Sequence, residues 1–222
     1  MKTFFSADNF LFYCCMVVLD VAVLSLMWLV CCIPVVTIVP ATAALYYSCV
    51  KCVRFKQPGP YLNFFQSFLG NLRTGVPVSA AFLVVAWVLY KLYGVLNVML
   101  PDGSGVTAVV IIGFLLFLLF PVGVFSVAYG LLSRFGYTAS ALIMDAVRLT
   151  FKHLPLVAVI AVVNAAAVLF CIKFVYFMPW LVMPAVSTLL VSRKMEPLLR
   201  PYTPDLEALM ELPEEDRPWY LK

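Results

Sequence analysis

Three polar side chains stand inside long apolar stretches of the sequence and could take part in binding an ion or a solute. Asp20 is the single charge between residues 9 and 50, Lys91 lies within residues 77–99, and Asn164 lies within residues 155–175. An ionisable group at bilayer depth costs about 2.5–3.5 kcal/mol on insertion scales, so each is a candidate intramembrane polar site.

Each of the three also has a structural interpretation. Asp20 would sit at a membrane boundary if residues 8–20 lie along the interface and do not span. Lys91 can extend its ammonium group to the outer headgroups, and Asn164 can hydrogen-bond a neighbouring helix.

A second candidate is a break in the backbone between Pro34 and Pro40. Prolines interrupt helices, and unwound backbone at membrane depth is found where protein or a water-filled cavity covers it. Transporters build binding sites in this way, but an outer turn between two helices has the same composition. The candidate binding or structural motif consists of Pro34, Thr37, Pro40, Thr42, Tyr46 and Tyr47.

Other chemistry has little support. The sequence has no phosphate-binding loop, HExxH zinc motif or nucleophile elbow. Its one histidine is His153, and its one Cys-x-x-Cys, from Cys49 to Cys52, has no histidine nearby. It has no dense basic patch for nucleic acid. We therefore expect no enzyme activity, cofactor or metal, and no nucleic-acid partner.

The elements that must position these residues are membrane helices. Hydrophobic residues make up 64% of the 222-residue chain and charged residues 12%, whereas soluble domains are about half apolar and a quarter charged. A bilayer core needs about 20 apolar residues per helix. The sequence predicts an all-α polytopic membrane protein with about six spans in three hairpins, at about 9–33, 40–55, 77–99, 106–133, 155–175 and 178–194.

Positive charge indicates the orientation. All lysines and arginines except Lys91 and Lys173 lie before the first span, in the second and fourth connections or the span ends that border them, or at and after the end of the last span. Because basic residues concentrate on the cytoplasmic side, both termini are expected in the cytoplasm and the protein in the plasma membrane as a multi-pass protein.

Two connecting segments have amphipathic helical patterns. Residues 61–74 place aromatic and leucine side chains on one face and Asn63, Gln66, Ser67, Asn71 and Arg73 on the other; residues 139–152 have a similar pattern. Both are expected to lie along the inner leaflet as interfacial helices. Residues 1–195 would form one membrane domain, followed by a Pro-rich acidic cytoplasmic tail, 196–222.

The run Trp28-Leu-Val-Cys-Cys-Ile-Pro-Val-Val-Thr-Ile-Val-Pro-Ala-Thr-Ala-Ala-Leu-Tyr-Tyr47 resembles the signature of the YesL-like family of bacterial integral membrane proteins, a domain of unknown function. Phe64-Phe65-Gln-Ser-Phe68 and Met178-Pro-Trp-Leu-Val-Met-Pro-Ala185 are similar to further family motifs. Val39 departs from the glycine usual in the family.

The resemblance implies a protein of the bacterial inner membrane that accompanies carbohydrate ABC importers and their regulators. We therefore expect a non-enzymatic accessory or regulatory component associated with carbohydrate uptake, with the bilayer and possible sugar-importer subunits as partners. The alternative is a small-solute transporter or channel with its site at the Pro34–Pro40 break, which requires Asp20, Lys91, Asn164 and the break to converge on one cavity.

Overall fold

The computed structural model describes residues 10–99, 105–173 and 177–202, and within these ranges the regular structure is entirely helical, as predicted. The elements in chain order are α1 (Phe10–Cys31), η1 (Val35–Thr37), α2 (Ile38–Ser48), η2 (Cys49–Arg54), α3 (Pro60–Met99), α4 (Gly105–Leu132), α5 (Ala139–Lys152), α6 (Leu154–Lys173), α7 (Phe177–Leu199) and η3 (Arg200–Tyr202).

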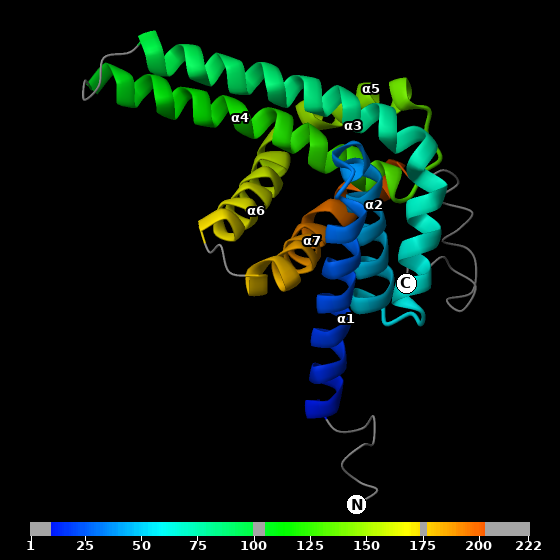
Figure 1. Ribbon diagram of the computed structural model, residues 1–222. Coiled ribbons are helices and arrows are strands. Elements are labelled where there is room, and N and C mark those ends of the chain that lie inside the picture. Colours follow the sequence, from blue (N-terminus) through cyan, green and yellow to red (C-terminus); the bar gives the residue numbers. More distant parts are fainter. Residues whose placement is uncertain (1–9, 100–104, 174–176, 203–222) are drawn as a thin grey trace, which may run out of the picture.

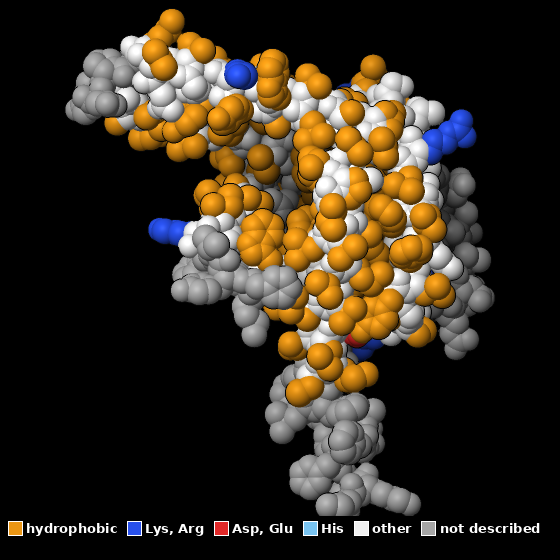
Figure 2. Space-filling view, in the orientation of Figure 1, with side chains coloured by type: hydrophobic (Ala, Val, Ile, Leu, Met, Phe, Trp, Pro, Cys, Tyr) orange, Lys and Arg blue, Asp and Glu red, His pale blue; other side chains and the backbone are white. Residues whose placement is uncertain are grey.

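Four helical stretches in the described part of the chain are long and apolar enough to cross a bilayer: Val35–Arg54, Pro60–Met99, Thr107–Leu132 and Leu154–Lys173. Cys15–Cys31 is a shorter apolar helix. Large apolar side chains are exposed along these helices, and Val98 reaches 87% exposure. Figure 2 shows them covering α1 and the hairpin of α3 and α4. Contiguous apolar surface of this kind is compatible with contact to lipid.

The longest helix departs from the prediction. Residues 61–74 and 77–99 were expected to form two helices with Pro77 at the start of the second, but both belong to α3, with Pro77 inside it. Proline has no amide hydrogen and its ring crowds the carbonyl four residues earlier, so it bends a helix without necessarily ending it. Figure 1 shows α3 bending between its first half, beside α2, and its second half, which forms a hairpin with α4.

The first half of α3 packs closely on α2. Gly75 faces the ring of Pro40, with no side chain of its own between the two helices. Ser79 Oγ accepts a 3.0 Å hydrogen bond from the amide of Val39 and donates to the carbonyl of Gly75. The N–H groups of a first helical turn have no partner within their own helix. Ser79 therefore caps α2 from a neighbouring element.

α5 occupies the predicted residues 139–152. Leu142, Ala146 and Leu149 on its apolar face are buried in the main hydrophobic core with residues of α4, α6 and α7. The expectation that this face lies in the inner leaflet is therefore wrong for these three side chains, because other helices cover them. α5 joins the end of α4 to the start of α6.

The helices do not all run in one direction. Figure 1 shows the hairpin formed by the second half of α3 and by α4 running across the direction of α1 and α2. The first half of α3, the end of α2 and the end of α4 meet around a common cavity. The candidate site lies at this junction.

Candidate functional site

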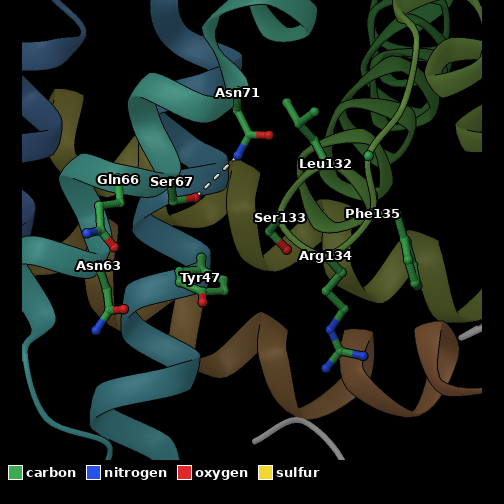
Figure 3. A pocket seen from close by; sticks show the side chains of 10 residues that line it. Tyr47, Asn63, Gln66, Ser67, Asn71, Leu132, Ser133, Arg134 and Phe135 are labelled. Atoms are coloured by element: carbon green, nitrogen blue, oxygen red, sulfur yellow. Dashed lines mark hydrogen bonds between the residues drawn. The ribbon is translucent and has the colours of Figure 1, made fainter. Parts of the chain in front are cut away.

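A cavity of about 300 Å³ opens between the first half of α3, the end of α2 and the turn after α4. We call it the amide pocket. Figure 3 shows the α3 side chains on one side and Ser133, Arg134 and Phe135 on the other. Its lining residues are Tyr47, Asn63, Gln66, Ser67, Asn71, Leu132, Ser133, Arg134, Phe135 and Gly136.

The α3 wall is the polar face of residues 61–74. Asn63, Gln66, Ser67 and Asn71 share this face because residues three and four apart are neighbours on a helix. Asn71 Nδ2 donates to Ser67 Oγ at 3.3 Å, and Gln66 is exposed. The amphipathic pattern placed these four side chains on one face of an interfacial helix, but in the structure they line a pocket within the protein's own fold, and Arg73 of the same predicted face does not.

Asn63 also fixes the start of α3. Its amide nitrogen donates to the carbonyls of Gly59 and Pro58 at 2.7 and 3.1 Å, and its Oδ1 accepts from Lys51 Nζ at 2.8 Å. Gly59 adopts a φ of +79°, a conformation that glycine reaches without steric cost. Lys51 Nζ also donates to the hydroxyl of Tyr47 at 3.1 Å. These bonds tie the end of α2 to α3 at one rim of the pocket.

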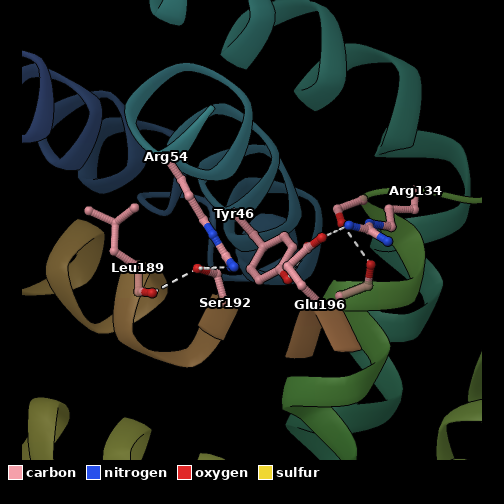
Figure 4. Close-up of polar contacts among 8 residues, drawn as sticks. Tyr46, Arg54, Arg134, Leu189, Ser192 and Glu196 are labelled. Atoms are coloured by element: carbon pink, nitrogen blue, oxygen red, sulfur yellow. Dashed lines mark hydrogen bonds and ion pairs between the residues drawn. The ribbon is translucent and has the colours of Figure 1, made fainter. Parts of the chain in front are cut away.

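A buried ionic cluster lies beside the pocket and consists of Tyr46, Arg134 and Glu196. We call it the Glu196 cluster. Arg134 and Glu196 form an ion pair with side-chain exposures of 2% and 8%. Tyr46 donates from its hydroxyl to Glu196 Oε1 at 2.7 Å. Figure 4 shows these side chains converging from α2, α7 and the residues after α4. The cluster connects three segments that are distant in sequence.

The position of Glu196 corrects the predicted start of the cytoplasmic tail. α7 continues to Leu199, so Glu196 is a buried helical residue and not the first residue of an exposed tail. Nearby, Arg54 Nη1 donates to Ser192 Oγ at 3.2 Å. Removing one partner of a buried ion pair leaves an uncompensated charge and typically costs 3–5 kcal/mol. Residues 203–222 of the predicted tail lie outside the described residues.

The three intramembrane polar candidates lie in separate environments. Asp20 accepts a 2.7 Å hydrogen bond from the hydroxyl of Tyr61 at an exposed position. Lys91 Nζ lies 5.8 Å from the centre of the Trp87 ring, on the second half of α3. The described contacts do not bring either residue to the Pro34–Pro40 break.

Asn164 forms hydrogen bonds to a neighbouring helix, as its structural interpretation predicts. Its Nδ2 donates to Ser126 Oγ at 2.8 Å and to the hydroxyl of Tyr129 at 3.0 Å. All three side chains lie between α4 and α6. Interhelical hydrogen bonds of this kind contribute about 0.6 kcal/mol on average in membrane proteins.

The Pro34–Pro40 break is a turn between α1 and α2 that is exposed from Pro34 to Val36 and buried at Val39 and Pro40. Thr37 donates from its hydroxyl to the carbonyls of Cys31 and Pro34. Thr42 donates to the carbonyl of Ile38 at 2.6 Å and accepts from Trp28 Nε1 at 3.2 Å. The two threonine hydroxyls of this motif are therefore used by the turn and by α1. At its far end, Tyr47 lines the amide pocket and Tyr46 joins the Glu196 cluster.

The chemistry that this arrangement offers is hydrogen bonding. Amides donate and accept at once, and hydroxyls can do either. The described residues contain no group of three or more His, Cys, Asp or Glu side chains placed to hold a metal ion. The sequence did not predict the pocket. The one pattern that indicates it is the row of polar residues at helical spacing in residues 61–74, four of which line the pocket.

Comparison with known proteins gives one finding. Residues 21–93 match the model of a family described as "Protein of unknown function, DUF624". No curated protein and no solved structure matches the chain. The matched segment covers the second half of α1, all of α2 and most of α3. It therefore includes one wall of the amide pocket, and the similarity is to an uncharacterised domain family.

Proposed function

We propose that this chain is a non-enzymatic accessory or regulatory component of the bacterial inner membrane, associated with carbohydrate uptake, with both termini in the cytoplasm. The observation that carries the proposal is the amide pocket. It places hydrogen-bonding side chains together in a chain of 64% hydrophobic residues. The resemblance to the YesL-like family supports the link to sugar import.

The pocket chemistry favours a small neutral solute with several hydroxyl groups. Gln66 and Asn71 offer amides, Ser67 offers a hydroxyl, and Tyr47 adds an aromatic ring. The charge of Arg134 faces Glu196 in the buried ion pair. A volume of about 300 Å³ is at the lower end of the range for small-molecule sites, which suits one or two sugar rings.

The transporter alternative receives less support. It requires Asp20, Lys91 and Asn164 to converge on the Pro34–Pro40 break, but each contacts a different neighbour. At the break, Pro40 packs against Gly75, whereas Val35 and Val36 are 52% and 44% exposed and, within the described part of the chain, line no cavity with the three polar residues.

The test of the accessory role is copurification. The protein is crosslinked in native bacterial membranes, extracted in mild detergent, and its partners are identified by mass spectrometry. We expect permease or sensor subunits of a sugar importer in stoichiometric amounts. Recovery of this chain by itself, with solute flux in reconstituted vesicles, would refute the proposal.

The test of the pocket is calorimetric titration of the purified protein with a panel of mono- and disaccharides. Asn71→Leu should abolish binding, because it removes an amide from the wall. Asn97→Leu makes the same chemical change at an exposed position of α3 outside the pocket and should leave binding intact. Equal effects of the two variants would exclude the pocket as the binding site.

A further inference from the structure

A second cavity, of about 240 Å³, lies against the outer side of α5. We call it the α5 pocket. Arg148 and Lys152 line it from α5, four residues apart and hence on one face of that helix. Tyr137 lies on the connection before α5 and Tyr202 in η3, and Leu131 is among the apolar lining residues. None of these residues belongs to the amide pocket.

The position of α5 places this cavity at a membrane boundary. α5 follows one candidate span, which ends at Leu132, and precedes another, which begins at Leu154. A helix of 14 residues that joins two such spans lies near the surface where both end. Basic side chains at this level face phospholipid headgroups.

The exposed side of α5 combines charge with apolar surface. Met144 and Phe151 are 55% and 61% exposed, and Leu154, which follows α5, is 50% exposed. Arg148 lies between Met144 and Phe151 at helical spacing, so cationic and apolar groups share one stripe. A phospholipid presents phosphate and acyl chain to a protein side by side, and this stripe matches both.

The one acidic side chain among the described residues that line the α5 pocket, Asp145, leaves Arg148 and Lys152 able to bind an anion. Asp145 pairs with Arg148 at 3.5 Å, with side-chain exposures of 41% and 72%. Exposed pairs at this spacing contribute little and exchange readily. Burial, the negative charge of Asp145 and a hydrogen bond with Asp145 raise the pKa of Tyr137 above its ordinary value. Lys152 Nζ lies 5.3 Å from the centre of the Tyr202 ring.

We propose that the α5 pocket binds the phosphate of an anionic membrane phospholipid, with Arg148 and Lys152 as its cationic contacts. Two cations against one carboxylate leave a net positive site. Met144 and Phe151, both exposed, supply apolar surface for the acyl chains next to it. The proposal is independent of the solute bound by the amide pocket.

The experiment is native mass spectrometry of delipidated protein titrated with phosphatidylglycerol, with phosphatidylcholine or with inorganic phosphate. We expect phosphatidylglycerol to bind at least fivefold more tightly than phosphatidylcholine. Each basic residue near an anionic bilayer surface contributes about fivefold in affinity, so R148Q/K152Q should weaken binding on the order of twentyfold. The single variant R148Q changes a side chain that is 72% exposed and should weaken binding about fivefold without affecting folding.

The matched control is R193Q/K194Q, which removes the same charge from exposed positions of α7 outside the pocket. It should change affinity by less than about twofold. Equal binding of phosphatidylcholine, or an equal effect of the control, would overturn the proposal. Displacement of phosphatidylglycerol by inorganic phosphate at the same concentration would assign the site to a soluble anion and overturn the lipid assignment.

Discussion

The contact between Gly75 and Pro40 leads to a sharp prediction about helix packing. A methyl group at Gly75 would lie 2.7 Å from Cδ and 2.8 Å from Cβ of the Pro40 ring. Ordinary carbon contacts are about 3.5–4.0 Å. The proline ring is covalently closed onto the backbone and cannot rotate away. Gly75→Ala must therefore move α2 away from α3.

Two terms of opposite sign set the magnitude. Overpacking a well-packed core costs about 1–3 kcal/mol. Alanine also favours a helix over glycine by about 0.5–1 kcal/mol. The net expectation for Gly75→Ala is a free energy of unfolding lowered by up to about 2.5 kcal/mol.

The matched control is Gly70→Ala, on the same helix. A methyl group at Gly70 meets nothing within 4 Å, so only the propensity term acts. This variant should raise the free energy of unfolding by about 0.5–1 kcal/mol. The difference between the two variants cancels propensity and isolates the steric clash, at about 1–3 kcal/mol.

The assay is equilibrium unfolding in mixed micelles with increasing sodium dodecyl sulfate, followed by circular dichroism. Gly75→Ala should unfold at a lower fraction of dodecyl sulfate than the parent protein, and Gly70→Ala at a higher one. If both alanine variants were stabilised to the same extent, the close approach of α2 and α3 would be refuted.

Three further predictions concern buried polar contacts. Ser79→Ala leaves the buried amide of Val39 without its acceptor, so stability should fall by about 1–3 kcal/mol and hydrogen exchange at that amide should accelerate; unchanged exchange would contradict the cap. Glu196→Met removes the charge that faces Arg134 and should cost about 3–5 kcal/mol. In a double-mutant cycle, R134M/E196M should cost less than the sum of R134M and E196M, and strict additivity would refute the coupling. Asn164→Leu should cost about 0.6–1.7 kcal/mol in the same unfolding assay, and a loss of function with no loss of stability would contradict its structural role.

Local patterns predicted most of the helices. The segment 139–152 was expected from its periodicity alone, and a helix occupies those residues. Helical spacing also identified the polar face of residues 61–74. The continuous α3 was missed because Pro77 is compatible with either a helix start or a bend, and only the packing on α2 decides between them.

The candidate site was less predictable because its parts are distant in sequence. Tyr46 and Glu196 are 150 residues apart, and no periodicity connects them. Glu196 is followed by Pro197 and by an acidic, proline-rich segment, which reads as an exposed tail. Its burial follows from the counter-charge of Arg134, a residue that positive-charge counting uses only to assign orientation. The burial of Glu196 therefore depends on its contacts with Arg134 and Tyr46, which local sequence patterns do not reveal.

The Glu196 cluster has a consequence for how the protein is made. Arg134 is synthesised before α5, α6 and α7, and at 5–20 residues per second its acidic partner follows about 3–12 s later. During that interval the guanidinium has no Glu196 to face and is held near water. α2 and α3, by contrast, can assemble as soon as Ser79 has been synthesised. The ion pair between Arg134 and Glu196 can therefore form only after α7 has been synthesised, and Arg134 becomes buried at that late step.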